Sequence, residues 1–153
     1  DDQGLLRQSL AAVEGAIPAL VAALRAHATQ GVQLACLAAL ESVCSSTKCM
    51  SDHAGGDPQA SSPAKYAGRQ YKPLEWRALQ VKTKAIEEGA LAAVVASMRA
   101  HYRDPSMQEM GCLALRNICY GADPSDLDLG ARQQKVADEG AITAAITAIA
   151  SHR

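Results

Sequence analysis

The stretch EGALAAVVASMRAH (residues 88–101) decides the fold, because two further copies of it occur, EGAIPALVAALRAH (residues 14–27) and EGAITAAITAIASH (residues 139–152). Each copy opens with an acidic residue, a glycine and an alanine and closes on a histidine. Between these ends, apolar residues recur at i, i+3, i+4 and i+7, which is one face of an α-helix. They are Ile17, Leu20, Val21 and Leu24, then Leu91, Val94, Val95 and Met98, then Ile142, Ala145, Ile146 and Ile149. So narrow a stripe needs neighbouring copies to bury it, which predicts stacked helices.

The composition bounds the class of protein. The chain has 153 residues, no phenylalanine and one tryptophan, which suits helices that pack closely through small side chains. A net charge of -1, from 15 basic and 16 acidic residues, gives no overall attraction to nucleic acid or anionic membranes. The chain shows neither a membrane span nor a signal peptide, and it lacks an initiating methionine. We therefore expect a piece of a longer intracellular protein, cytoplasmic or nuclear.

The five cysteines make an odd count, and four of them lie within apolar helical patterns. In an intracellular protein such residues are typically reduced and behave as small hydrophobic side chains. We therefore expect buried thiols rather than disulfides at the positions Cys36, Cys44, Cys112 and Cys119.

Helix boundaries follow from glycine, proline and capping signals. Gly15, Gly89 and Gly140 are expected to adopt left-handed turns, Thr29 to cap a helix, and Asp104 with Pro105 to start another. The predicted helices span residues 5–13, 18–26, 32–44, 73–88, 91–102, 106–120, 128–137 and 142–150. The polar, Ser-, Gly- and Pro-rich residues 45–72 are expected to form an exposed loop, and residues 121–130 a longer corner.

Two of these strings carry a family resemblance. GAIPALVAAL (residues 15–24) and QEMGCLALRNICYG (residues 108–121) resemble the second and third helices of armadillo repeats, the family of beta-catenin and importin alpha. The resemblance implies an all-α, right-handed α-solenoid of three-helix repeats whose third helices line a concave groove. It divides a single domain, residues 1–153, into repeat 1 (3–44), an insertion (45–72), repeat 2 (73–121) and an incomplete repeat 3 (122–153). Both glycine-to-glycine spacings exceed the roughly 40 to 47 residues of such a unit.

The resemblance also implies a function, a non-enzymatic scaffold that holds a segment of a partner protein in the groove. In the family an asparagine on each third helix holds the ligand backbone, and a tryptophan one turn earlier cradles side chains. Asn117 matches the asparagine, whereas Leu113 replaces the tryptophan; the corresponding residues of repeat 1 are Ser42 and Ala38. The missing tryptophans argue against an importin-like cargo ladder. The expected groove residues are Ser42, Gln108, Leu113, Arg116 and Asn117.

Asn117 also has a structural interpretation. Its amide can offer a donor and an acceptor to an extended ligand, or it can tie adjacent third helices together within the protein. In the same way, Arg116 can pair with an acidic group of a ligand. The incomplete third repeat leaves Ile142, Ile146 and Ile149 without a covering helix, so we expect this end to be covered by another chain, to self-associate or to fray.

A strip of basic residues offers an alternative function. Six cations are interleaved with Tyr66, Tyr71 and Trp76, and this combination can grip phosphates and stack on bases. The alternative is therefore a binder of nucleic acid or of an acidic or phosphorylated partner; the structural interpretation is a solvated loop that leads into a helix. We call these residues the basic strip: Lys65, Arg69, Lys72, Arg77, Lys82 and Lys84.

Metal and catalytic sites are weakly indicated. His27, His101 and His152 share one register, but stacked helices lie roughly 8 to 10 Å apart, whereas a metal binds its ligands at about 2 Å. Cys44, Cys49 and His53 lack the spacing of a zinc site. No phosphate-binding glycine loop, G-x-S-x-G or H-E-x-x-H motif occurs. The sequence therefore predicts no enzyme, no cofactor and no metal.

Overall fold

The computed structural model describes residues 15–45, 73–120 and 129–152, and this part of the chain is helical and contains no strand. The expected all-α class is thus confirmed for these residues. The helices are α2 (Ala16–Ala26), α3 (Gln30–Cys44), α4 (Pro73–Glu87), α5 (Ala90–Ala100), α6 (Pro105–Cys119), α7 (Leu129–Asp138) and α8 (Ala141–Ser151).

Glycine turns place α2, α5 and α8. Gly15, Gly89 and Gly140 have φ angles of 89°, 76° and 78°, and they are the only described residues with positive φ. This left-handed conformation is costly for a residue with a Cβ atom and open to glycine. The three predicted turns are confirmed, and each glycine stands immediately before the first residue of a helix.

The starts of α3 and α6 differ in their capping chemistry. The carboxylate of Asp104 accepts hydrogen bonds from the backbone amides of Ser106 (2.9 Å) and Met107 (3.2 Å), and Pro105 occupies the first helical position. This confirms the predicted start signal. Thr29 stands at the cap position of α3 but makes no side-chain capping bond, and the helix begins at Gln30, before the predicted boundary.

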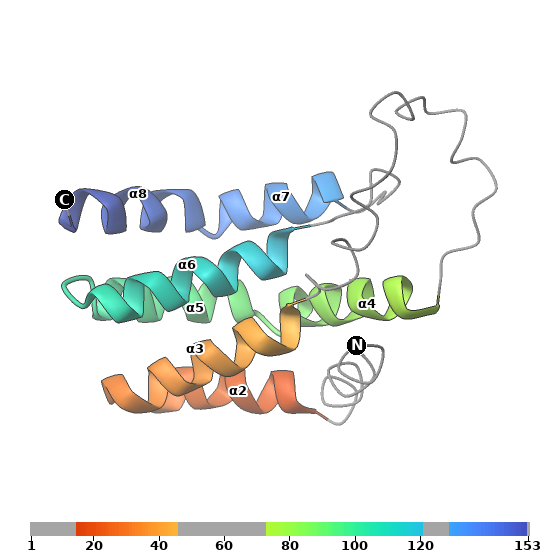
Figure 1. The fold of residues 1–153 in the computed structure, drawn as a ribbon, viewed down its shortest axis with the longest axis horizontal. Helices are drawn as coiled ribbons and strands as arrows, with labels where there is room; N and C mark the ends of the chain where they lie inside the picture. Colours follow the sequence, from red (N-terminus) through yellow and green to blue (C-terminus); the bar gives the residue numbers. More distant parts are fainter. Residues whose placement is uncertain (1–14, 46–72, 121–128, 153) are drawn as a thin grey trace, which may run out of the picture.

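The helices lie side by side in a regular order (Figure 1). α2 and α3 pack on each other and on the middle group, where α3 contacts α6 and α2 contacts α5. On the other side of the middle group α8 contacts both α5 and α6. α4 leads into α5, and α7 into α8, end to end through their glycine turns. The copies of the motif on α2, α5 and α8 are therefore neighbours in space.

The core is built from small and medium-sized side chains along these contacts. Ile17, Val21 and Leu24 of α2 are buried, and so are Leu91, Val95 and Met98 at the same positions of α5. Gly111 of α6 allows close approach, because a Cβ there would lie 2.4 Å from the Met98 side chain. Close packing of this kind replaces the large aromatic core that the composition lacks.

The third copy of the motif behaves differently. Ala141, Ala144 and Ala148 form the buried side of α8, whereas Ile142, Ile146 and Ile149 are 58%, 61% and 64% exposed. The expected exposure of these isoleucines is confirmed, and we call the three residues the isoleucine stripe. None of the described helices is both long and apolar enough to cross a lipid bilayer.

Most of the predicted helices occur within a few residues of their expected bounds. The predicted helix at 5–13, nearly all of the insertion at 45–72 and most of the corner at 121–130 lie outside the described residues. The repeat boundaries therefore stay predictions, although the helices expected within repeats 1, 2 and 3 are present at α2 to α8.

Candidate protein-binding face

Asn117 connects α6 to α3. Its side-chain amide donates to the Glu41 carbonyl at 3.2 Å and to the Glu41 carboxylate at 2.9 Å, and the residue is 5% exposed. A buried amide without such partners would lose roughly 1 to 3 kcal/mol. The geometry therefore gives Asn117 a structural role between the two helices, which is one of the two interpretations left open by the sequence.

Gln108 faces the interior of the protein. It is 5% exposed, and its amide donates to the carbonyls of Met98 (2.8 Å) and His101 (3.0 Å) at the end of α5. The last carbonyls of a helix have no partner within the helix, so such bonds cap its C-terminus. Gln108 thus holds the start of α6 against the end of α5, on the buried side of the helix.

Gln33 repeats this arrangement on α3. It is 6% exposed, and its amide donates to the carbonyls of Leu24 (3.1 Å) and His27 (2.8 Å) at the end of α2. The sequence analysis did not single out Gln33, although it stands three residues after the first residue of α3, as Gln108 does in α6. Gln33 thus holds α3 against the end of α2 in the same way as Gln108 holds α6 against the end of α5.

The remaining expected groove residues lie toward the surface. Arg116 is exposed, Leu113 is half-buried, and Ser42 of α3 is exposed. Ser42 follows Glu41 in the chain, and Arg116 precedes Asn117, so the Asn117 contact brings these two exposed positions to one edge of the α3–α6 pair. The outer face of this pair therefore carries an exposed serine, an exposed arginine and a part-exposed leucine.

The basic strip does not form one described surface. Lys65, Arg69 and Lys72 lie outside the described residues, and the position of the Arg77 side chain is likewise not described. Lys84 is exposed and pairs with Glu88 at 2.6 Å, and this hydrogen bond raises its pKa. Lys82 is 4% exposed. Of the two described cations, only Lys84 lies where a polyanion could contact it.

Lys82 instead caps α6. Its ammonium donates to the Tyr120 carbonyl at 2.5 Å and lies 5.9 Å from the centroid of the Tyr120 ring. A cation near the C-terminal carbonyls of a helix is favoured by the helix dipole. Arg132 of α7, also 4% exposed, is the second buried cation at this end of α6. The sequence analysis did not predict that Lys82 and Arg132 are buried, because lysine and arginine side chains are usually exposed to solvent.

The described cysteines are free thiols, and two of them stand at equivalent positions. Burial raises the pKa of the Cys44 thiol to about 12, with Lys82 opposing and Glu41 adding to the shift. Burial likewise raises the pKa of Cys119 to about 11, opposed by Lys82 and Arg132. Both groups are protonated at neutral pH, so neither is an activated nucleophile.

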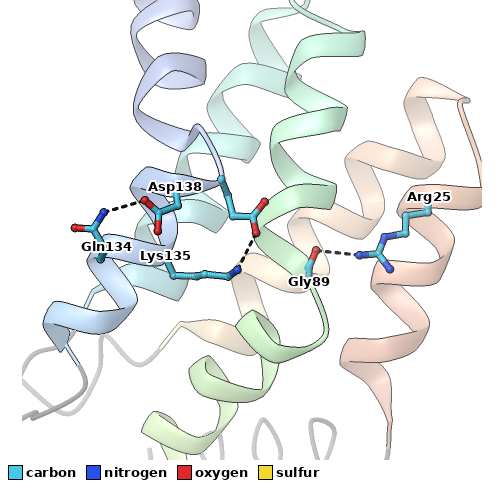
Figure 2. Close-up of polar contacts among 6 residues, drawn as sticks. Arg25, Gly89, Gln134, Lys135 and Asp138 are labelled. Atoms are coloured by element: carbon cyan, nitrogen blue, oxygen red, sulfur yellow. Dashed lines mark hydrogen bonds and ion pairs between the residues drawn. The ribbon is translucent and has the colours of Figure 1, made fainter.

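Arginines near the ends of α2 and α5 reach toward the next glycine turn. The Arg25 guanidinium donates to the Gly89 carbonyl at 3.4 Å (Figure 2). A Cβ added to Gly140 would lie 2.9 Å from Nη2 of Arg99, so Arg99 approaches that turn in the same way. In α8 the corresponding position is Ala150. These contacts join one copy of the motif to the next.

The same glycine turns carry ion pairs on the helices that precede them. Lys135 pairs with Glu139 at 3.2 Å, as Lys84 does with Glu88, and Gln134 donates to Asp138 at 2.8 Å (Figure 2). These i, i+4 pairs are exposed, so each adds only a few tenths of a kcal/mol, roughly 0.3 to 0.5. They support α4 and α7.

The histidines of the shared register do not converge. The His152 ring nitrogen lies 3.2 Å from the Tyr102 carbonyl. Within the described ranges no group of three or more His, Cys, Asp and Glu side chains is placed to hold a metal ion. The motif Cys44, Cys49 and His53 has only Cys44 inside those ranges.

No protein-family model, no curated protein and no solved structure matches this chain.

Proposed function

We propose that this protein is a non-enzymatic scaffold, an armadillo-type α-solenoid that binds a segment of a partner protein along the outer face of α3 and α6. The observation that carries the proposal is the contact that Asn117 makes with Glu41, because it holds α3 and α6 in a fixed register with Ser42 and Arg116 at one edge. A rigid face with few exposed charges suits recognition of a protein segment.

The repeated contacts support the solenoid part of the proposal. Gln33 and Gln108 cap the preceding helices through equivalent carbonyls, and Arg25 and Arg99 approach successive glycine turns. Contacts that recur with the sequence motif are what one expects when each unit packs only against its neighbours. The resemblance to armadillo repeats favours the same architecture.

The partner contacts are assigned to Ser42, Leu113 and Arg116. Arg116 supplies a planar cation for a carboxylate of the partner, and Leu113 supplies apolar area beside it. Asn117 and Gln108 act as positioning residues for this face, since their amides are engaged with Glu41 and with the end of α5.

Site-specific photo-crosslinking tests the proposal in cells. A photoreactive residue placed at Ser42 should crosslink to a discrete partner, and Arg116→Glu should reduce the crosslink about tenfold. The matched control is the same photoreactive residue at Ala96, an exposed position of α5. Equal crosslinking from Ala96, or no effect of Arg116→Glu, contradicts the proposed face.

The alternative function is tested by salt. Binding of single-stranded nucleic acid or of a phosphopeptide through the basic strip should weaken steeply as salt concentration rises, because phosphate contacts release counterions. The buried Lys82 and the Lys84–Glu88 pair leave the described part of the strip with little free positive charge. We therefore favour binding along the outer face of α3 and α6 over binding through the basic strip.

A further inference from the structure

We infer that the isoleucine stripe of α8, together with the adjoining flank of α6, is a docking site for an amphipathic helix of a partner protein. This surface shares Arg116 with the α3–α6 face, but the isoleucine stripe belongs to α8, and a test on that stripe does not depend on the function proposed above. The inference rests on how the same positions are covered elsewhere in the molecule.

The first observation is the contrast between identical positions. Ile17, Val21 and Leu24 on α2, which packs against α3, are 0%, 2% and 3% exposed. On α5, which packs against α6, Leu91, Val95 and Met98 are 1%, 2% and 1% exposed. The isoleucine stripe occupies the same positions of α8 and is more than half exposed. A helix seated on α8 as α6 is seated on α5 would bury it.

The second observation concerns α6 and is independent of α8. Gln33 and Gln108 make equivalent bonds to the ends of α2 and α5, so they define which positions of α3 and α6 correspond to each other. By this correspondence, Leu37 and Cys44 of α3 are 0% and 2% exposed, whereas their counterparts Cys112 and Cys119 of α6 are only half-buried. α3 has α6 beside it, and α6 has an open flank. Because α8 contacts α6, the open flank and the isoleucine stripe adjoin each other.

Charge and capping specify the chemistry of the occupant. Arg116 stands on α6 where Glu41 stands on α3, and Glu41 faces the neighbouring helix through Asn117. A helix beside α6 therefore meets an exposed guanidinium, which favours an acidic residue in its last turn. Glutamines in the first turns of α3 and α6 cap the ends of α2 and α5. The occupant should thus carry a glutamine in its first turn.

A second copy of this chain fits less well. Three part-exposed isoleucines offer on the order of 200 Å² of apolar surface, so two stripes facing each other fall well below the roughly 1,200 Å² of a specific interface. Such pairing would also leave Arg116 without an acidic partner. A helix laid between α8 and α6 contacts the stripe, the α6 flank and the helix end together.

A peptide with the sequence of α6 serves as the probe, because α6 is the helix that covers the equivalent stripe on α5. The labelled peptide spans residues 105–120, with both cysteines replaced by serine, and a second version carries glutamate in place of its own asparagine, the residue that meets Glu41 in the α3–α6 pair. Each is titrated by fluorescence anisotropy into the 153-residue protein. The acidic peptide should bind at least about fivefold more tightly than the parent peptide, since its glutamate adds a charge pair with Arg116 of the protein.

Protein variants give the controls. Ile146→Asp should weaken binding of the acidic peptide at least about tenfold, whereas Val32→Asp, at another part-exposed apolar position, should leave it unchanged. Arg116→Glu should reverse the preference between the two peptides. Circular dichroism of each variant reports whether the fold is retained; Ile149→Asp provides a second variant if Ile146→Asp is unfolded.

Three outcomes would overturn the inference. One is binding that is insensitive to both Ile146→Asp and Ile149→Asp. Another is a wild-type protein that binds neither peptide and sediments as a monomer. The third is a wild-type dimer that Ile146→Asp dissociates and that excludes the peptides, which would make a second copy the occupant.

Discussion

α5 and α8 are built from the same motif, yet one helix is enclosed and the other is half open. Leu91 of α5 is 1% exposed, and Ile142, at the same position of α8, is 58% exposed. Both helices start at a left-handed glycine and present the same apolar spacing. The difference lies in their neighbours, because α6 covers α5 and no described helix covers the isoleucine stripe. The apolar pattern thus indicates which side of a helix can be buried, and the neighbouring helices determine whether that side is buried.

Truncating the two equivalent side chains should give the largest contrast. Leu91→Ala creates a cavity in a closed core and should lower the free energy of unfolding by about 2 to 5 kcal/mol. Ile142→Ala removes an exposed group and should change it by no more than about 0.5 kcal/mol. Urea denaturation followed by circular dichroism measures both. Similar losses for the two variants would mean that the isoleucine stripe is already covered in solution.

The second contrast concerns the ends of the helices. Gln108→Leu removes the amide that caps α5 and leaves the Met98 and His101 carbonyls without this donor. The expected loss is about 1 to 3 kcal/mol of unfolding free energy. Gln133→Leu, at an exposed position of α7, is the matched control and should be nearly neutral. A neutral Gln108→Leu would show that water replaces the amide.

The contact between α3 and α6 can be tested by placing a second negative charge beside Glu41. Asn117→Asp places a carboxylate against Glu41 and removes two hydrogen bonds, so it should cost roughly 1 to 3 kcal/mol of stability. Adding Glu41→Gln should recover part of this loss, because the repulsion disappears. Thermal unfolding of the single and double variants gives the comparison. Independent, additive effects would place the Asn117 side chain elsewhere than beside Glu41.

Alkaline pH distinguishes the covered thiol from the part-exposed one. In the unfolded chain a cysteine loses its proton near pH 9, whereas burial holds the folded pKa at about 12 for Cys44 and about 11 for Cys119. The unfolded state therefore binds fewer protons in this window, and stability should fall as pH rises from about 9 toward these values.

The measurement is the urea midpoint at pH 8 and at pH 10.5. Cys44→Ala and Cys119→Ala should each show a smaller decrease between the two pH values than the wild type does. If the urea midpoint of both variants decreased as much as that of the wild type, the loss of stability at alkaline pH would come from other groups.

Local signals in the sequence were enough for the helices. The three glycines predicted the left-handed turns, and Asp104 with Pro105 predicted the start of α6, because these effects act within a few residues. The start of α3 was misplaced because the helix begins at Gln30 without a side-chain cap at Thr29. Boundaries set by backbone contacts alone leave little trace in composition.

The candidate site was harder to predict, because it depends on which side chains point toward a neighbouring helix and which point toward solvent. Gln108 and Asn117 are polar residues that face inward, and only the packed structure shows which carbonyls they reach. Gln33 and Lys82 were not recognised as structural groups for the same reason. The exposure of the isoleucine stripe was predicted from the incomplete third repeat, and it is confirmed.

The burial of Lys82 and Arg132 changes what an approaching molecule meets. Both side chains are 4% exposed, so neither offers its charged group for direct contact at the surface. The balance of 15 basic and 16 acidic residues still describes the attraction felt at long range. At contact, however, a phosphate chain would find fewer accessible cations than that balance suggests. Long-range attraction and direct contact thus depend on different sets of charges in this protein.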